Sequence, residues 1–141
     1  FFAPGPRITL LDPKRVERVF ALHPILHLNQ QEITSYTGKE ELKAAAEEIH
    51  RFTQNTVIVT LGADGCYYYD GEKEETIPGV PAEQLDTIGA GDSHIGAVIA
   101  GLQCGKTIEE AIATAKRVSA KVVETEGALL SDEAFASLDL L

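Results

Sequence analysis

The sequence predicts an α/β domain in which a mainly parallel sheet is flanked by helices. Two apolar runs, ILHL at residues 25–28 and TVIVTLG at residues 56–62, have the composition of buried strands. Between them lies KEELKAAAEEIHRF, residues 39–52, whose residue types favour a helix. Strand, helix and strand at this spacing are typical of a unit whose two strands are parallel neighbours.

The elements before this unit are marked by capping residues. FFAPGPR, at the start, resembles the end of a strand followed by a Pro/Gly loop. Asp12 is a suitable N-cap and Pro13 a suitable first residue for a helix over DPKRVERVFAL. After Asn29, QQEITSYTG predicts a brief helix that stops at Gly38.

The elements after the unit are a hairpin and three helices. CYYYDGEKEETIP, residues 66–78, predicts two extended segments about a central DG turn. A glycine-rich turn then precedes a helix over residues 92–103, a second helix over residues 108–125 and a short helix after Ser131.

Composition narrows the class of protein. The chain has 141 residues, 44% of them hydrophobic and 24% charged, which fits a single globular domain. Its net charge of −10 argues against a nucleic-acid partner or an anionic membrane partner, because both require clustered Lys and Arg. Cys66 and Cys104 match neither a CxxC pair nor a disulfide framework, so we expect two buried thiols and a cytoplasmic, reducing location.

The turn IGAGDS leaves a bare backbone just before a helix. Gly89 and Gly91 bracket Ala90, and the first amides of a helix lack intrahelical partners. Such amides attract an anion, phosphate above all. The alternative is a tight turn in which Asp92 merely caps the helix, because a lone Gly-x-Gly is neither a Walker A motif nor a full GxGxxG.

Four ordered motifs carry a resemblance to a known family. DTIGAGDSHIGAVIAGLQCGKTIEEAIATA closely resembles the C-terminal signature of the PfkB, or ribokinase-like, carbohydrate kinases. HLNQQE resembles the Asn-x-x-Glu motif of that family, VTLGADG its nucleotide-side strand and turn, and ETEGA its closing glycine segment. The resemblance implies a ribokinase-like fold and ATP-dependent phosphorylation of a hydroxyl group on a sugar-like small molecule.

The resemblance assigns roles within the turn. Asp92 matches the catalytic base, which accepts the proton of the attacking hydroxyl. Gly89, Ala90 and Gly91 match the anion hole, whose amides stabilise charge on the transferred phosphoryl group.

The resemblance also assigns residues to the metal and the nucleotide. Asn29 and Glu32 match the Asn-x-x-Glu motif, in which the Glu acts through water on Mg²⁺; otherwise they are a capping Asn and a solvated helical Glu. Thr60, Gly62 and Gly65 match the turn that approaches the nucleotide, although GADG alone is also typical of an ordinary turn.

Asp86 matches the position where some members of the family bind a monovalent cation such as K⁺. Gly127, Ser131 and nearby carbonyl groups would help to bind it. The alternative is that Asp86 simply holds the turn.

The sequence departs from the family pattern at two positions. His94 stands where the family often has Phe, and we expect a packed histidine. Lys116 stands where Asn or His often meets the adenine, so it either contacts the nucleotide or lies along the helix surface. The other histidines show no metal-ligand spacing: His23, His27 and His50.

Two interpretations of the function follow, one catalytic and one non-catalytic. Residues 1–141 are expected to be a single nucleotide-binding and catalytic portion of a PfkB-type kinase, completed by an N-terminal half with the substrate lid or by a companion chain such as a second copy. The other reading is a non-catalytic nucleotide-binding fragment, or half of a split enzyme. Sugar, nucleoside and vitamin-precursor substrates are not separated by this sequence.

Overall fold

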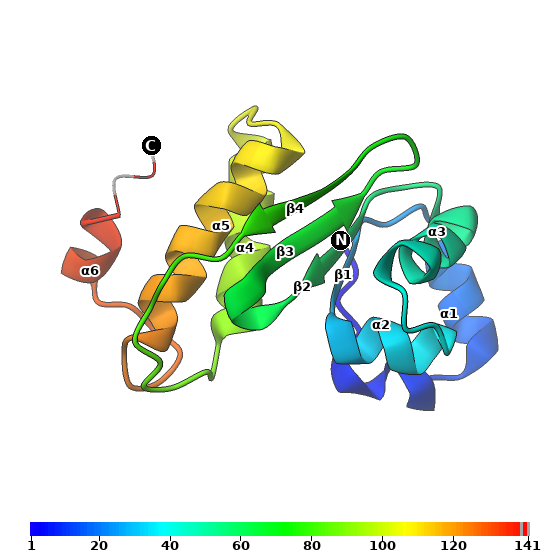
Figure 1. Cartoon of the computed structure of the whole chain (residues 1–141), viewed down its shortest axis with the longest axis horizontal. Coiled ribbons are helices and arrows are strands. Elements are labelled where there is room, and N and C mark those ends of the chain that lie inside the picture. Colours follow the sequence, from blue (N-terminus) through cyan, green and yellow to red (C-terminus); the bar gives the residue numbers. More distant parts are fainter. Residues whose placement is uncertain (139, 141) are drawn as a thin grey trace. The chain divides into compact units, whose positions relative to one another are not determined.

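The computed structural model describes residues 1–138 and residue 140, and it divides into two compact units, Phe1–Thr76 and Ile77–Leu141 (Figure 1). The first unit contains η1 (Gly5–Leu10), α1 (Pro13–Phe20), β1 (Leu26–Asn29), α2 (Gln30–Thr37), α3 (Leu42–Thr53), β2 (Val57–Thr60), η2 (Gly62–Asp64) and β3 (Gly65–Tyr69). Strand β4 (Glu74–Pro78) leads into the second unit, which contains α4 (Ala90–Gln103), α5 (Ile108–Val123) and α6 (Asp132–Ala136).

The sheet is mixed and has the strand order β1-β2-β3-β4. Strands β1 and β2 are parallel neighbours, with Asn29 opposite Thr60, whereas β2 and β3 are antiparallel. Phe2 adds an isolated parallel bridge to Leu26. The α/β class and the parallel pairing of the two apolar runs are confirmed; the antiparallel part arises because the short η2 turn reverses the chain directly after β2.

Local sequence signals determine where the helices of the first unit begin and end. The Asp12 carboxylate accepts a hydrogen bond from the Lys14 amide, and Pro13 opens α1, as predicted. Helix α2 ends at Gly38, whose φ of 69° lies in the left-handed region that glycine adopts without steric cost.

The core of the first unit lies between the sheet and its helices. Its fully buried members include Leu28 on β1, Ile33 on α2, Ile49 on α3 and Val59 on β2. Because Ile33 follows Asn29 within one helical turn, packing of Ile33 also fixes the direction in which the chain leaves β1.

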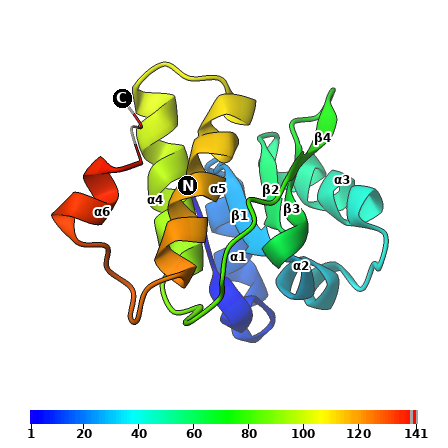
Figure 2. The same ribbon diagram turned by 60° about the vertical axis from the view of Figure 1, so that its left-hand side comes forward.

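The second unit consists mainly of helices. Helices α4 and α5 pack directly against each other, as both views show (Figure 2). A Cβ atom on Gly101 would lie 3.0 Å from the Cβ of Ala111, so a small residue there lets the two helices approach closely. Helix α4 begins at Ala90, before the predicted start at Asp92, because the left-handed Gly89 occupies the N-cap position.

The prediction of two buried thiols is half wrong. Both cysteines are free, and Cys66 is buried on β3, but Cys104 is exposed. Cys104 caps the C-terminus of α4, where the chain turns toward Gly105 at the surface. None of the helices in the described part of the chain has the length and apolar character needed to span a membrane.

We expect Ile33→Ala to lower the free energy of unfolding by about 2–5 kcal/mol, the usual cost of truncating a buried Ile. Ile33 is 0% exposed and belongs to the core of the first unit. Urea unfolding followed by circular dichroism measures the change. Phe52→Ala is the control, because Phe52 on α3 is 62% exposed; equal losses in the two variants would contradict the described core.

Candidate functional site

Helix α4 begins without a side-chain cap. Its N-cap residue is Gly89, with φ 80° and ψ −6°, and no side chain bonds to the first amides of the helix. The N-caps of α2 and α5, by contrast, are Asn29 and Thr107, whose side chains accept from backbone amides. The Ala90 amide donates to the Thr87 carbonyl at 3.3 Å, which leaves the amides of Gly91 and Asp92 for an anion. The positive end of the helix dipole favours an anion there.

The two glycines of this turn differ in what the fold requires of them. A Cβ atom on Gly89 would lie 2.5 Å from the Cβ of Ala128, and φ is positive, so the fold itself demands glycine. A Cβ atom on Gly91 would meet nothing within 4 Å, and the residue has helical geometry. The fold leaves space at Gly91, so a bare backbone there suits the close approach of a ligand.

Asp92 does not cap the helix. It is exposed and lies in the first turn, whereas the N-cap position belongs to Gly89. The alternative that Asp92 serves as the cap is therefore wrong. An exposed carboxylate here lies among the same first-turn amides that attract an anion.

Asp86 holds the approach to this helix. One carboxylate oxygen accepts from the amide of Ile88 at 2.9 Å and the other from the amide of Gly127 at 3.1 Å. These two backbone hydrogen bonds, from Ile88 first and then from Gly127, hold the pKa of Asp86 below its usual value. The turn-holding role is thus present, and the cation-binding role stays a prediction; a carboxylate with both oxygens engaged still has lone pairs for a cation.

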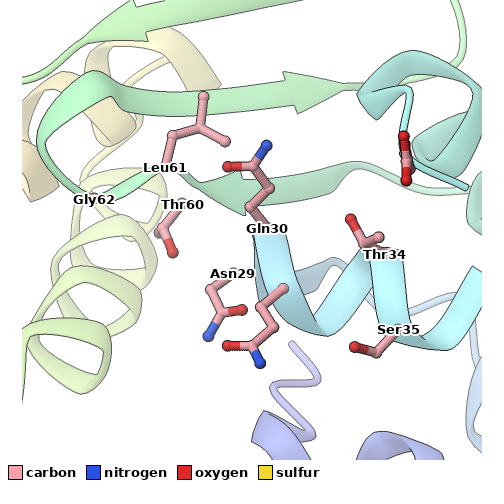
Figure 3. A pocket seen from close by; sticks show the side chains of 9 residues that line it. Asn29, Gln30, Thr34, Ser35, Thr60, Leu61 and Gly62 are labelled. Atoms are coloured by element: carbon pink, nitrogen blue, oxygen red, sulfur yellow. The ribbon is translucent and has the colours of Figure 1, made fainter.

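The carboxyl ends of β1 and β2 form a second candidate site. Asn29 and Thr60 are register partners at these ends, and both line a cavity of about 550 Å³ (Figure 3). The cavity is lined by polar and small residues from two strand ends and α2: Asn29, Gln30, Gln31, Thr34, Ser35, Glu40, Thr60, Leu61 and Gly62. Ligands of open α/β sheets bind beyond the carboxyl ends of strands, which makes this cavity a binding-site candidate.

Asn29 and Glu32 form a reciprocal capping box. The Asn29 side chain accepts from the Glu32 amide at 2.8 Å, and the Glu32 carboxylate accepts from the Asn29 amide at 2.9 Å. The capping alternative is therefore correct as a description of the local structure. It also fixes the Glu32 carboxylate at the end of β1, beside the cavity, so capping and a metal role are compatible.

The turn after β2 is built by glycines. Gly62 has φ 61° and Gly65 has φ 122°, and the turn is closed by a hydrogen bond from the Leu61 amide to the Gly65 carbonyl at 2.9 Å. A Cβ atom on Gly62 would meet nothing within 4 Å. Gly62 and Thr60 line the same cavity as Asn29 and so are brought together as predicted.

The other residues singled out in the sequence are either buried on α4 and α5 or close to backbone carbonyls of the first unit. His94 is 2% exposed, which confirms a packed histidine. Lys116 is 7% exposed, so it does not lie along an exposed helix surface, and its nucleotide contact stays a prediction. The Nδ1 atoms of His23 and His50 lie at hydrogen-bond distance from the carbonyls of Thr53 and Asn55.

The oxygen atoms of Glu32 and Asn29 suit Mg²⁺ held mainly through water, although Asn29 lines the cavity and Glu32 does not. Among the described residues, no group of three or more His, Cys, Asp or Glu side chains could hold a metal ion by itself. The Glu32 carboxylate, with the Asn29 amide oxygen near it, offers the hard oxygen ligands that Mg²⁺ prefers when it keeps several waters and binds substrate phosphates.

Comparison with known proteins decides the family. Residues 8–134 match the family described as pfkB family carbohydrate kinase. The chain belongs to the pfkB family.

Relatives within the pfkB family are similar over much of this chain. The uncharacterized sugar kinase YegV of Escherichia coli is 33% identical over 127 residues, which cover 87% of this chain and 40% of YegV. A ribokinase from Thermotoga maritima has a TM-score of 0.81 at 25% identity over 95% of this chain and 47% of that structure. An aminoimidazole riboside kinase from Salmonella enterica, complexed with aminoimidazole riboside and an ATP analogue, has a TM-score of 0.76 at 26% identity over 90% of this chain and 46% of that structure.

These comparisons confirm the ribokinase-like fold. They also show that the chain spans less than half the length of these relatives, 40% of YegV and 47% of the Thermotoga ribokinase.

Sequence reasoning missed some residues at both sites. Gln30, Thr34 and Ser35 line the cavity but lie in a helix of ordinary composition, so only their spacing along the face that follows Asn29 could have suggested them. Ala128 lies against Gly89. The ETEGA motif points to the segment that contains Ala128, but nothing in the motif shows that this residue packs on a turn 39 positions earlier.

We expect Asp86→Asn to lower the melting temperature at pH 7, because an amide cannot accept both backbone hydrogen bonds as strongly as a carboxylate. The folded-state pKa of Asp86 is below its unfolded value, so the stabilisation is present above the unfolded pKa and is lost as pH falls through the folded pKa. The difference from wild type should therefore shrink as the pH falls from 7 through the acid range, as measured by thermal melts.

The control is Asp132→Asn, at an exposed aspartate in the same unit. A difference at Asp86 that is independent of pH would contradict the role of the ionised carboxylate.

Proposed function

We propose that this chain is the nucleotide-binding portion of an ATP-dependent kinase that transfers the γ-phosphate of ATP to a hydroxyl group of a sugar or sugar-like small molecule. Asp92 is the general base in this proposal, and the amides of Gly89, Ala90 and Gly91 form the anion hole. Membership of the pfkB family supports the reaction class.

The proposal rests mainly on the open space around Gly91 in the first turn of α4. The fold has room for a side chain at Gly91, but the same is true of Gly96 later in the helix, so open space alone does not indicate a ligand. Gly91 differs from Gly96 because it lies in the first turn, where helix amides lack intrahelical partners. A phosphate approaching those amides would need the space that a side chain at Gly91 would fill.

The reaction balances with these groups alone. The substrate hydroxyl oxygen attacks the γ-phosphorus as its proton passes to the Asp92 carboxylate, and the bond from the γ-phosphorus to the bridging oxygen breaks to release ADP. Charge that builds on the equatorial oxygens is stabilised by the amides of the turn, which are already oriented by the left-handed Gly89. Exposure of Asp92 gives its carboxylate access to the hydroxyl.

A second group of residues is assigned to the nucleotide and the metal. Asn29, Thr60 and Gly62 line the polar cavity beyond β1 and β2, where close approach of phosphates or ribose needs small and polar side chains. Gly65 does not line the cavity but closes the turn after β2. Glu32 would hold Mg²⁺ through water, and Mg²⁺ would supply neutralisation of the phosphate charge. Lys116 is assigned to the nucleotide and Asp86 to a K⁺ ion.

The substrate is proposed as a class. The sugar kinase, ribokinase and riboside kinase relatives all act on sugars or sugar-bearing compounds by their names, so a hydroxyl of a sugar or nucleoside fits best. Two free thiols, one of them exposed, fit a reducing cytoplasm, where ATP is also supplied.

Gly91→Ala should separate folding from binding. The added methyl group should stabilise the helix by about 0.5–1 kcal/mol and weaken the rise in melting temperature that MgATP causes. Gly96→Ala is the matched control, because Gly96 lies in the same helix with nothing within 4 Å of its Cβ position. A Gly91→Ala protein with an undiminished MgATP shift would move the anion site elsewhere.

In the full-length enzyme, Asp92→Asn should lower turnover by a factor on the order of 10² to 10⁴, the usual contribution of a positioned general base. ATP binding should persist, because the anion hole is made of backbone amides. Loss of the charge near the helix N-terminus should cost only about 0.3–1 kcal/mol of stability. Single-turnover phosphorylation beside thermal melts measures both; near-wild-type turnover in a folded variant would end the catalytic assignment and favour the non-catalytic alternative.

A further inference from the structure

The segment before the glycine turn is tied to the end of α5 and the loop after it. The amides of Leu85 and Asp86 both donate to the carbonyl of Val123, at 2.8 and 3.2 Å. The Asp86 carboxylate connects these two segments, because one of its oxygens accepts from the Ile88 amide in the turn and the other from the Gly127 amide in the loop. One side chain thus holds both segments.

The turn itself rests on the next residue of that loop. A Cβ atom on Gly89 would lie 2.5 Å from the Cβ, 2.9 Å from the Cα and 3.2 Å from the carbonyl oxygen of Ala128. Gly89 is therefore in direct contact with Ala128, although Ala128 is otherwise exposed. Because Gly89 is the N-cap of α4, movement of Ala128 would shift the first amides of the helix.

We propose that residues 123–128, called here the C-terminal brace, position the anion-binding amides of α4, and that Ala128 is a positioning residue for them. The inference rests on the proposed function of the turn. Neither Ala128 nor any side chain of the brace needs to touch the ligand, because the brace acts through Gly89 and Asp86.

A linked equilibrium follows from this arrangement. If the brace and the bound phosphate favour the same conformation of the turn, the brace strengthens phosphate binding by some factor. Phosphate binding must then stabilise the brace by that same factor. The amide of Gly127 reports the state of the brace, because it donates to Asp86 and exchanges with solvent only when that hydrogen bond opens.

Hydrogen exchange at the Gly127 amide tests the linkage in the unaltered protein, with K⁺ held constant. The probe is a non-hydrolysable MgATP analogue, because it carries the γ-phosphate that the turn would bind. At a concentration of this analogue about 100 times its dissociation constant, exchange should slow by up to about 100-fold. Unchanged exchange at Gly127 under the saturating analogue would overturn the inference.

Two variants test the contact with Gly89. Ala128→Gly removes the methyl group, and Ala128→Val enlarges it. Each should weaken the rise in melting temperature that the MgATP analogue causes. In the complete enzyme, each should lower kcat more than it raises KM for ATP, because misplaced amides serve the transition state least well. Leu129→Ala is the control, since the neighbouring Leu129 is 87% exposed. Ala128→Gly adds no atoms and remains informative if Ala128→Val does not fold.

The failures are distinguishable. If both folded Ala128 variants keep the wild-type kcat and the wild-type melting-temperature shift with the MgATP analogue, while Gly91→Ala loses that shift, the brace inference is wrong and the proposed function stands. If Gly91→Ala also keeps the shift, the assignment of the turn as an anion hole fails, and the brace inference fails with it.

Discussion

The left-handed backbone of Gly89 is the constraint on which the candidate chemistry depends. At φ 80° the chain turns sharply enough for α4 to begin at the next residue, so the first amides are those of Ala90, Gly91 and Asp92. The Ala90 amide donates to the Thr87 carbonyl, but no side chain caps this end, so the helix dipole and the amides of Gly91 and Asp92 can act on an anion. Asp92 then falls inside the first turn, exposed, instead of being consumed as a cap.

The fold was predictable where the signals are local. The parallel pairing of residues 26–29 with residues 57–60 follows from two apolar runs, the second of them β-branched, that a helix separates. Asp12 and Gly38 mark helix ends by their capping preferences. The mixed character of the sheet was less visible, because the reversal after β2 depends on positive φ angles at Gly62 and Gly65. The start of α4 was misplaced for the same reason, since a glycine can cap a helix by conformation alone.

The sequence predicted several residues of the sites, but it did not predict how distant segments pack around them. Asn29, Thr60 and Gly62 line one cavity as expected, because parallel strands bring their carboxyl ends to one edge. The helix face beyond Asn29 and the contact of Ala128 with Gly89 depend on packing between segments far apart in sequence. The same limit explains Cys104: its exposure depends on where α4 ends, which the residue type does not show.

One residue can have both a structural role and a functional role. Asn29 and Glu32 satisfy each other's backbone amides, and that same capping box holds the Glu32 carboxylate at a strand end where a phosphate-bound Mg²⁺ could use it. Asp86 likewise holds the turn and keeps lone pairs for a cation.

At the two glycines of the turn, a structural explanation and a functional explanation can be told apart. Gly89 has a sufficient structural explanation in its positive φ and its contact with Ala128, so its presence says nothing about a ligand. Gly91 has neither explanation, because its geometry is helical and the space around its Cβ position is open. Gly96 shares both properties, so what separates Gly91 is its place in the first turn of α4, beside the amides that attract an anion. In the sequence Gly89 and Gly91 look alike, and their surroundings in the fold distinguish a glycine that the fold requires from one that a bound phosphate would require.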